Sequence, residues 1–282
     1  MQAFKSNSPR AYLVGVLAGI LLLLSPLVAP DGEPMIYKVR IGQTIGAFAA
    51  ANNLRMSTSD DPRPSAIAVV GKEDWMSIFL KETDSIIRYE DGIFGTDLPI
   101  GTSLLLGQEG GVITDLSVHV YAEDYAFEKT DRSARLLIDQ LLKSGWKAIQ
   151  LHYPKDAEDK NSTGREIFYA TLVSASGNQL IVSLAPYLDP PEFQMDIEIY
   201  ASDEFRDRRR EIVAARRFAL RNESDNSSLR LWIDDPDWTP EKLGMKLIDV
   251  PNPKWDPNNH LSGHKIFKRW QMPDGTIEPL FQ

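Results

Sequence analysis

The chain has 282 residues, which is enough for about two domains of ordinary size. With 43% apolar and 25% charged residues, its composition excludes a disordered or collagen-like chain. The 40 acidic residues outnumber the 31 basic ones and give a net charge of -9, which excludes nucleic acid as a general partner because phosphate binding needs surplus lysine and arginine. The absence of cysteine rules out disulfides, thiolate metal sites and cysteine nucleophiles.

The strongest signal is residues 11–29, which carry no charge and are apolar on every side of a helix. Lys5 and Arg10 precede this stretch, and Asp31 follows it. Two interpretations are open: an uncleaved membrane anchor, which needs about 17 to 25 apolar residues, and a cleaved signal peptide, whose apolar core is shorter. In both cases the basic flank stays in the cytoplasm and everything from Asp31 onward is exported.

Ser25 and Pro26 are consistent with the end of a signal-peptide core, which favours cleavage. The small residue expected three positions before a cut after Ala29 is replaced by Leu27. We therefore predict an anchor, with residues 1–30 as a cytoplasmic stub and membrane segment and the rest of the chain in the periplasm or outside the cell.

Residues 31–111 form the first of two exported regions that we predict. In chain order, the pattern predicts a strand at Tyr37–Ile41, a helix at Thr44–Asn52, a helix at Asp74–Leu80 and a strand at Ile100–Leu106. The region ends at Gly107–Gly111, where paired glycines favour a flexible, turn-prone joint between the two regions.

The run Tyr37-Lys-Val-Arg-Ile-Gly-Gln-Thr-Ile, followed by the stretch Ala47–Leu54, resembles the opening of a LysM peptidoglycan-binding module, with its tyrosine strand, Gly-x-Thr turn and helix. The resemblance covers only residues 37–54, and the closing strand of that family is not evident in the sequence. It implies a cell-wall glycan as ligand. The residue pattern by itself predicts a generic strand, turn and helix, and we adopt this second interpretation.

Residues 112–282 form the second region, which we predict to be an α+β domain with a mixed sheet. It opens with a strand at Leu116–Ala122, a helix with Asp131 as its N-cap and Lys143 as its last residue, and a strand at Lys147–Tyr153. This β–α–β unit predicts two neighbouring parallel strands joined by a right-handed crossover.

The pattern then changes. A hairpin is predicted over Glu166–Leu184, and the strand Phe193–Tyr200 alternates apolar and polar residues, so one of its faces meets water. A helix rich in arginine follows from Ser202 to Leu220. From Leu231 onward the chain is rich in proline and aspartate and carries four of the six tryptophans, for which we predict loops held by buried indole rings.

His119 and His152 are the groups that would suggest catalysis. The predicted crossover puts them on adjacent parallel strands near the carboxyl ends, where open α/β sheets hold ligands. Glu123 and Asp124 follow close by and are candidate acid–base partners of an exported hydrolase. The alternative is that both histidines are ordinary strand residues, and the common motifs of serine hydrolases, phosphate-binding loops and zinc proteases are absent from the sequence.

His260 and His264 are four residues apart and would share one face of a helix, from which two imidazoles could hold a metal ion. Gly263 between them and Pro257 before them argue against that helix. The alternative is a pair of loop histidines that pack near tryptophans. We predict no cofactor.

The helix Ser202–Leu220 carries a local positive charge inside an acidic chain. Four arginines at or just beyond this helix fall broadly on one side: Arg206, Arg210, Arg217 and Arg221. We predict that this side docks onto an acidic protein or an anionic lipid surface, because guanidinium groups bind carboxylates and phosphates through paired hydrogen bonds. The alternative is a solvated face with ion pairs inside the helix.

Together these observations predict a membrane-anchored exported protein that binds a protein partner in the periplasm or cell envelope and is not an enzyme. An assembly factor and a toxin-neutralising protein are two forms it could take. Two alternatives stay open. One is an exported hydrolase that uses His119 and His152, and the other is a cell-wall glycan binder that uses Tyr37–Leu54 or the tryptophan-rich tail.

Overall fold

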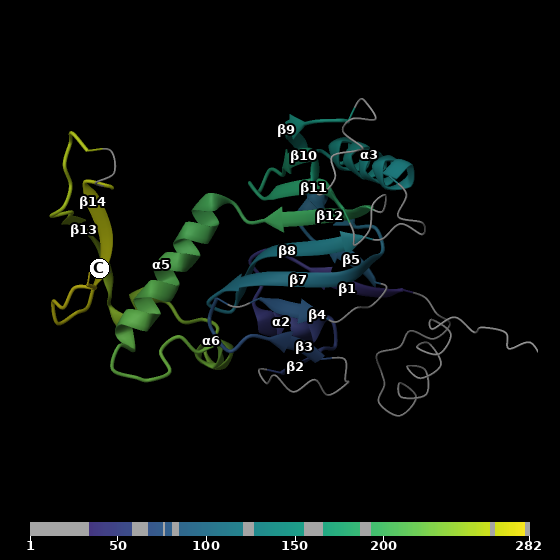
Figure 1. The fold of residues 1–282 in the computed structure, drawn as a ribbon. Helices are drawn as coiled ribbons and strands as arrows, with labels where there is room; N and C mark the ends of the chain where they lie inside the picture. Colours follow the sequence, from purple (N-terminus) through teal and green to yellow (C-terminus); the bar gives the residue numbers. More distant parts are fainter. Residues whose placement is uncertain are drawn as a thin grey trace, which may run out of the picture.

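A mixed β-sheet of twelve strands organises the part of the chain that the computed structural model describes (Figure 1). The described residues are 34–57, 67–75, 77–80, 85–120, 127–154, 166–186, 193–259 and 263–279. The predicted α+β class and mixed sheet are confirmed. The predicted membrane segment 11–29 lies outside the described residues, and among those residues no helix is long and apolar enough to span a bilayer.

The strands of this sheet are β1 (Met35–Val39), β2 (Arg55–Ser57), β3 (Ile67–Val70), β4 (Ile78–Leu80), β5 (Ser85–Tyr89), β6 (Thr96–Asp97), β7 (Gly101–Glu109), β8 (Val112–Val120), β9 (Lys147–Leu151), β10 (Ile167–Val173), β11 (Gln179–Pro186) and β12 (Phe193–Tyr200). The helices are α2 (Ile45–Ala51), α3 (Phe127–Lys143), α5 (Asp203–Ala219) and α6 (Leu229–Asp234), with short 3-10 turns η2 (Gly92–Phe94) and η3 (Pro240–Leu243). β13 (Lys246–Pro251) and β14 (Ile266–Gln271) form a separate hairpin.

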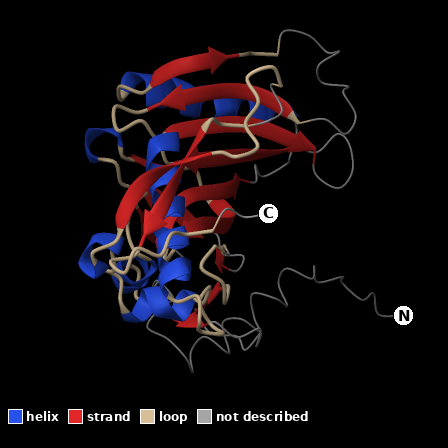
Figure 2. Ribbon diagram, turned by 90° about the vertical axis from the view of Figure 1, so that its left-hand side faces the viewer, coloured by secondary structure: helices blue, strands red, loops and turns tan. Residues whose placement is uncertain are grey.

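The main path of the sheet follows the order β2-β3-β4-β7-β8-β12-β11-β10-β9, and Figure 2 shows its strands stacked one above another. β1, β5 and β6 branch from this path, because β5 pairs with the first residue of β7 and with β1 and β6. The strand, turn and helix predicted at the start of the exported part are confirmed as β1 and α2, with the Thr44 hydroxyl accepting a hydrogen bond from the Ala47 N–H at 3.1 Å.

In the central strands β8 and β12, one face is buried and the other carries mainly polar side chains. In β12 the odd-numbered residues from Phe193 to Ile199 are buried, whereas the even-numbered ones are half-buried, and β8 follows the same alternation. Helix α3 packs on β11 and β12. The ring of Tyr89 in the branch strand β5 lies 6.2 Å from the ring of Trp146, in the turn between α3 and β9. For β12, the half-buried face with Gln194, Asp196 and Glu198 is the one that the sequence predicts to meet water.

The β–α–β unit spans more of the sheet than the sequence predicts. β8 and β9 run parallel and α3 connects them, but β12, β11 and β10 lie between the two strands. The prediction of neighbouring strands is wrong, because three later strands enter the gap. Helix α3 also begins earlier, at Phe127, and Asp131 is not its N-cap but pairs with Arg135 at 2.9 Å and accepts a hydrogen bond from the Tyr169 hydroxyl at 2.7 Å.

A tight turn at Gly110 and Gly111 joins β7 to β8, and both glycines have positive φ, 57° and 73°. The turn is buried under α5 and α6. A Cβ at Gly110 would lie 2.7 Å from a methyl carbon of Val213, and one at Gly111 would lie 2.9 Å from Cβ of Trp232. The predicted flexible joint at 107–111 is therefore the end of β7 and a packed hairpin turn, and one sheet runs through both predicted regions.

Beside this turn, Asp74 joins several segments in what we call the Asp74 junction (Asp74, Gly110, Arg217 and Ser227). The Asp74 side chain is fully buried, and its carboxylate accepts two hydrogen bonds from the Arg217 guanidinium, one of them from Nε at 3.0 Å. The Asp74 carbonyl accepts from the Gly110 N–H at 2.6 Å, and the Asp74 N–H donates to the Ser227 carbonyl at 2.9 Å. The helix predicted over Asp74–Leu80 is wrong, because Asp74 lies in a turn and residues 78–80 form β4.

Helix α5 has the bounds that the sequence predicts. The Ser202 hydroxyl caps it by accepting from the Phe205 N–H at 3.3 Å, and acidic residues in its first turn and basic residues in its last turn suit the helix dipole. The tail after α5 is more ordered than predicted. It forms α6 and the β13–β14 hairpin, which lies on the far side of α5 from the sheet (Figure 1), where the Trp270 indole donates to the Glu211 carbonyl at 2.9 Å.

Arg217→Ala should lower the free energy of unfolding by about 3 kcal/mol, the low end for a broken buried ion pair, because the Arg217 side chain keeps 39% of its surface exposed. The loss arises because Asp74 remains buried without its counter-charge. Urea denaturation measures it.

The matched control is Arg230→Ala, which breaks the exposed pair with Asp234 and should cost less than about 1 kcal/mol. Equal losses for the two variants would contradict a structural role for the Asp74 junction.

Candidate functional site

A pocket of about 450 Å³ opens beside α5 and is lined by that helix, by Trp75, by the end of β7 and by the C-terminal residues Glu278 and Pro279. We call it the α5 pocket. Three of the four predicted docking arginines line it: Arg210, Arg217 and Arg221. The fourth, Arg206, does not. It forms an ion pair with Asp203, and its guanidinium lies over the Tyr200 ring, 5.7 Å from the ring centroid.

Arg210 and Arg221 are the arginines of the pocket with side chains in reach of a ligand. The Arg210 side chain is 57% exposed, and its two carboxylate contacts, to Glu109 and Asp207, are both long at 3.4 Å. Arg221 is exposed, and its guanidinium donates to the Phe218 carbonyl at 3.3 Å. Exposed ion pairs such as those of Arg210 contribute about 0 to 1 kcal/mol to stability, so a carboxylate that binds in the pocket can replace them.

Arg217 is a structural residue of the pocket. Its hydrogen bonds to Asp74 raise the pKa of the guanidinium, so the charge that neutralises the buried carboxylate is held firmly. The sequence could not distinguish Arg217 from the other arginines, because Asp74 precedes it by 143 residues.

An apolar surface lies among these charges. Val213, Ala214 and Phe218 line the pocket, and the Trp75 indole, which also lines it, is 60% exposed. Exposed aromatic rings beside arginine are typical of the residues that dominate protein–protein contacts. No local sequence pattern singles out Trp75, because the arginines that share the pocket with it lie more than a hundred residues further along the chain.

The pocket also contains a buried carboxyl group. Glu278 is 6% exposed, and burial raises its pKa, although its Oε2 accepts a hydrogen bond from the Trp270 N–H at 3.2 Å. Since burial disfavours the ionised form of Glu278, this carboxyl opposes the arginines less than an exposed one would.

Two further arginines explain why α5 is so rich in this residue. Arg209 donates to the Gly110 carbonyl at 2.9 Å, and burial lowers its pKa to about 10. Arg216 is buried over the rings of Trp232 and Trp238, 4.5 and 5.3 Å from their centroids. Both hold α5 against the hairpin turn and α6. The arginine content of α5 therefore serves packing as well as the pocket.

On the polar face of the sheet, His119 of β8 is hydrogen-bonded to Asp196 of the neighbouring β12, with Nδ1 and Oδ1 2.7 Å apart. This hydrogen bond raises the pKa of His119. His152 is exposed just after β9 and is separated from β8 by three strands. The predicted placement of His119 and His152 on adjacent strands is wrong. Glu123 and Asp124 lie outside the described residues.

The predicted metal pair stays a prediction, because His264 is exposed before β14 and His260 lies outside the described residues. Within the described ranges, no group of three histidine, aspartate or glutamate side chains is arranged to hold a metal ion.

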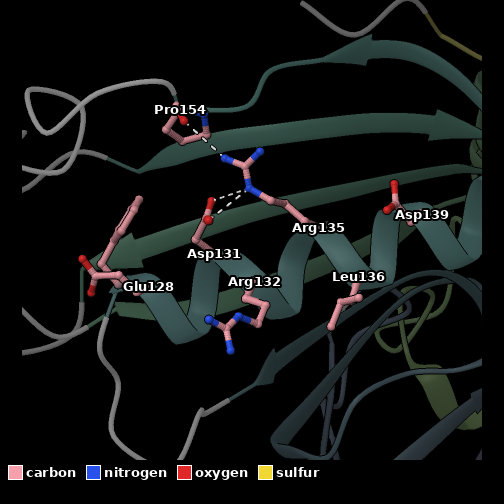
Figure 3. A pocket seen from close by; sticks show the side chains of 8 residues that line it. Glu128, Asp131, Arg132, Arg135, Leu136, Asp139 and Pro154 are labelled. Atoms are coloured by element: carbon pink, nitrogen blue, oxygen red, sulfur yellow. Dashed lines mark hydrogen bonds and ion pairs between the residues drawn. The ribbon is translucent and has the colours of Figure 1, made fainter.

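A second pocket, of about 470 Å³, lies along α3 (Figure 3). In that view Arg135 reaches from the helix to Asp131 and to the Pro154 carbonyl, 2.9 and 3.2 Å away. Phe127, the aromatic residue that lines this pocket, is buried, whereas Leu136 is 63% exposed. The α5 pocket, with exposed arginines and an exposed indole, is the stronger candidate.

The described fold is an α+β fold with a large mixed sheet, and the α5 pocket is lined by arginines and by the exposed Trp75 indole. No family model, curated protein or solved structure matches this chain.

The stability of the protein should fall as the pH rises through the pKa of His119. The hydrogen bond with Asp196 raises the folded-state pKa of His119 above its ordinary value of about 6.5, so its stabilising contribution is complete below about pH 6.5 and is lost at higher pH. Urea denaturation between about pH 5.5 and 8.5 measures this slope.

Asp196→Asn is the informative variant, because it removes the charge that favours the imidazolium and should flatten the pH dependence. An unchanged slope would show that the interaction between His119 and Asp196 is not its source.

Proposed function

We propose that this chain is a membrane-anchored exported protein that binds a protein partner in the cell envelope, and that the α5 pocket holds an acidic segment of that partner. The observation that carries the proposal is the make-up of the pocket, in which Arg210 and Arg221 surround an apolar lining and the Trp75 indole is 60% exposed. An assembly factor and a toxin-neutralising protein of the cell envelope are two forms that this function could take.

The residues that line the pocket indicate which side chains the partner's segment should carry. An apolar side chain of the partner packs against the Trp75 indole and Ala214, and carboxylates next to it accept hydrogen bonds from Arg210 and Arg221. Because the chain as a whole carries a net charge of -9, long-range attraction of acidic proteins is weak, and the short-range contacts in the pocket select the partner.

The burial of other aromatic residues favours a protein ligand over a cell-wall glycan. Tyr37, Trp232 and Trp270 are all less than 5% exposed, so their ring faces are covered and cannot stack on a sugar, whereas Trp238 and Trp255 of the tail are half-buried.

Peptides selected from a displayed random library against the full-length protein in detergent should combine aspartate or glutamate with an aromatic or aliphatic residue. Arg210→Glu/Arg221→Glu should weaken the binding of a selected fluorescein-labelled peptide at least tenfold, because each substitution replaces a hydrogen-bond donor with a repelling charge. Fluorescence anisotropy measures the dissociation constant, which should also rise between about 0.05 and 0.5 M NaCl.

The control is Arg208→Glu/Arg230→Glu, which makes the same change in net charge outside the pocket and should leave peptide binding within about twofold. Selected peptides without carboxylates, or equal losses in the two double variants, would contradict the proposed site.

The anchor is tested by fractionation. Full-length protein should stay in the membrane pellet through an alkaline carbonate wash, because about 17 or more apolar residues hold a helix in the bilayer. A variant with Leu21→Arg/Leu22→Arg, which puts two charges in the middle of the segment, should leave that fraction. A shorter soluble form of the unaltered chain, starting near Asp31 by mass spectrometry, would instead support a cleaved signal peptide.

A further inference from the structure

The polar face of the sheet carries a row of three side chains that the α5 pocket does not involve. His119 of β8 lies directly opposite Ser103 of β7 on one side and Asp196 of β12 on the other. Directly opposed residues of antiparallel strands project from the same face, with Cβ atoms about 4.5 to 5.5 Å apart. Ser103, His119 and Asp196 therefore stand side by side across three strands.

The orientation of the imidazole is set from one end of this row. The hydrogen bond to Asp196 engages Nδ1 of His119, and the Gln194 side-chain amide donates to the same carboxylate oxygen at 3.0 Å. An Nδ1–H that donates to a carboxylate leaves Nε2 of a neutral histidine as the acceptor. The His119 side chain is 36% exposed, so this nitrogen can meet a solute that approaches the face.

The strand that carries Ser103 is irregular at this point. The register of β7 against β8 shifts between Gly101 and Ser103, which leaves Thr102 out of the regular ladder. A Cβ at Gly101 would lie 2.6 Å from a methyl carbon of Val118 and 3.0 Å from the His119 carbonyl oxygen, so glycine permits the close approach of the two strands. Bulges of this kind re-aim side chains and are over-represented beside active sites.

From this arrangement we infer that Ser103, His119 and Asp196 form a nucleophilic serine site that cleaves acyl esters. Ser103 Oγ attacks the carbonyl carbon while its proton moves to His119 Nε2. The bond to the leaving alcohol breaks as Nε2 returns that proton to the alcohol oxygen. Water then attacks the acyl-serine, its proton passes through Nε2 back to Ser103 Oγ, and a carboxylic acid leaves. Asp196 is a positioning residue that acts through His119.

The charge of the surrounding face limits the substrate. Asp115 and Glu198 project from the same face of β8 and β12 as His119 and Asp196, so the site is acidic. An anionic ester would be repelled, and a neutral or cationic one is favoured.

A biotin-linked fluorophosphonate tests this site in the full-length protein. Ser103 Oγ should displace fluoride from phosphorus, and peptide mass spectrometry should locate the adduct on Ser103. His119→Gln should slow labelling at least about a hundredfold, the usual contribution of a positioned general base. Labelling should rise with pH as His119 loses its proton, and Asp196→Asn should move the midpoint of that rise to lower pH.

Ser117→Ala is the matched control, because Ser117 is a half-buried serine on the same face of β8 and should not affect labelling. Thermal melting of each variant establishes that it folds. The absence of an adduct on Ser103 in the unaltered protein, or an adduct that forms at the same rate in His119→Gln, would overturn the inference.

Discussion

A carboxylate buried just before β4 has to be neutralised, and Arg217 of α5 is the group that does so. The ion pair holds the last turn of α5 against the sheet, while the backbone of Asp74 binds Gly110 in the hairpin turn and Ser227 before α6. A buried charge without a partner costs several kcal/mol, so these segments have one favourable arrangement. The turn between β7 and β8 can pack in this arrangement only with glycines, because any side chain at Gly110 or Gly111 would meet Val213 or Trp232.

The arginines in α5 and just after its end are thus of two kinds. Arg209, Arg216 and Arg217 face the protein and bind carbonyls, indole rings and a buried carboxylate. Arg210 and Arg221 face outward, beside the Trp75 indole, and give the α5 pocket its proposed affinity for an acidic segment. The pocket therefore depends on the Asp74 junction, whereas the row around His119 depends only on the register of three strands. The two proposed sites can be lost independently.

Local patterns in the sequence predict much of this fold. The alternation in β12 gives its buried and polar faces, and Ser202 and the charges of α5 define that helix within a residue. The pairing of strands and side chains that lie far apart in the sequence cannot be predicted from local patterns. Nothing near His119 indicates that β12 will lie beside it, and the partner of Arg217 is 143 residues away. By itself the pair Gly110 and Gly111 predicts a flexible joint. The sequence around it does not indicate that Trp232, far along the chain, packs on this turn.

Amide hydrogen exchange in Asp74→Asn protein tests the central role of the Asp74 junction most directly. Because α5 is held to the sheet through this carboxylate, amides in Asp203–Ala219 and Leu229–Asp234 should lose protection, while those of β11 and β12 keep it. Unchanged protection in α5, or an equal loss throughout the sheet, would contradict the account.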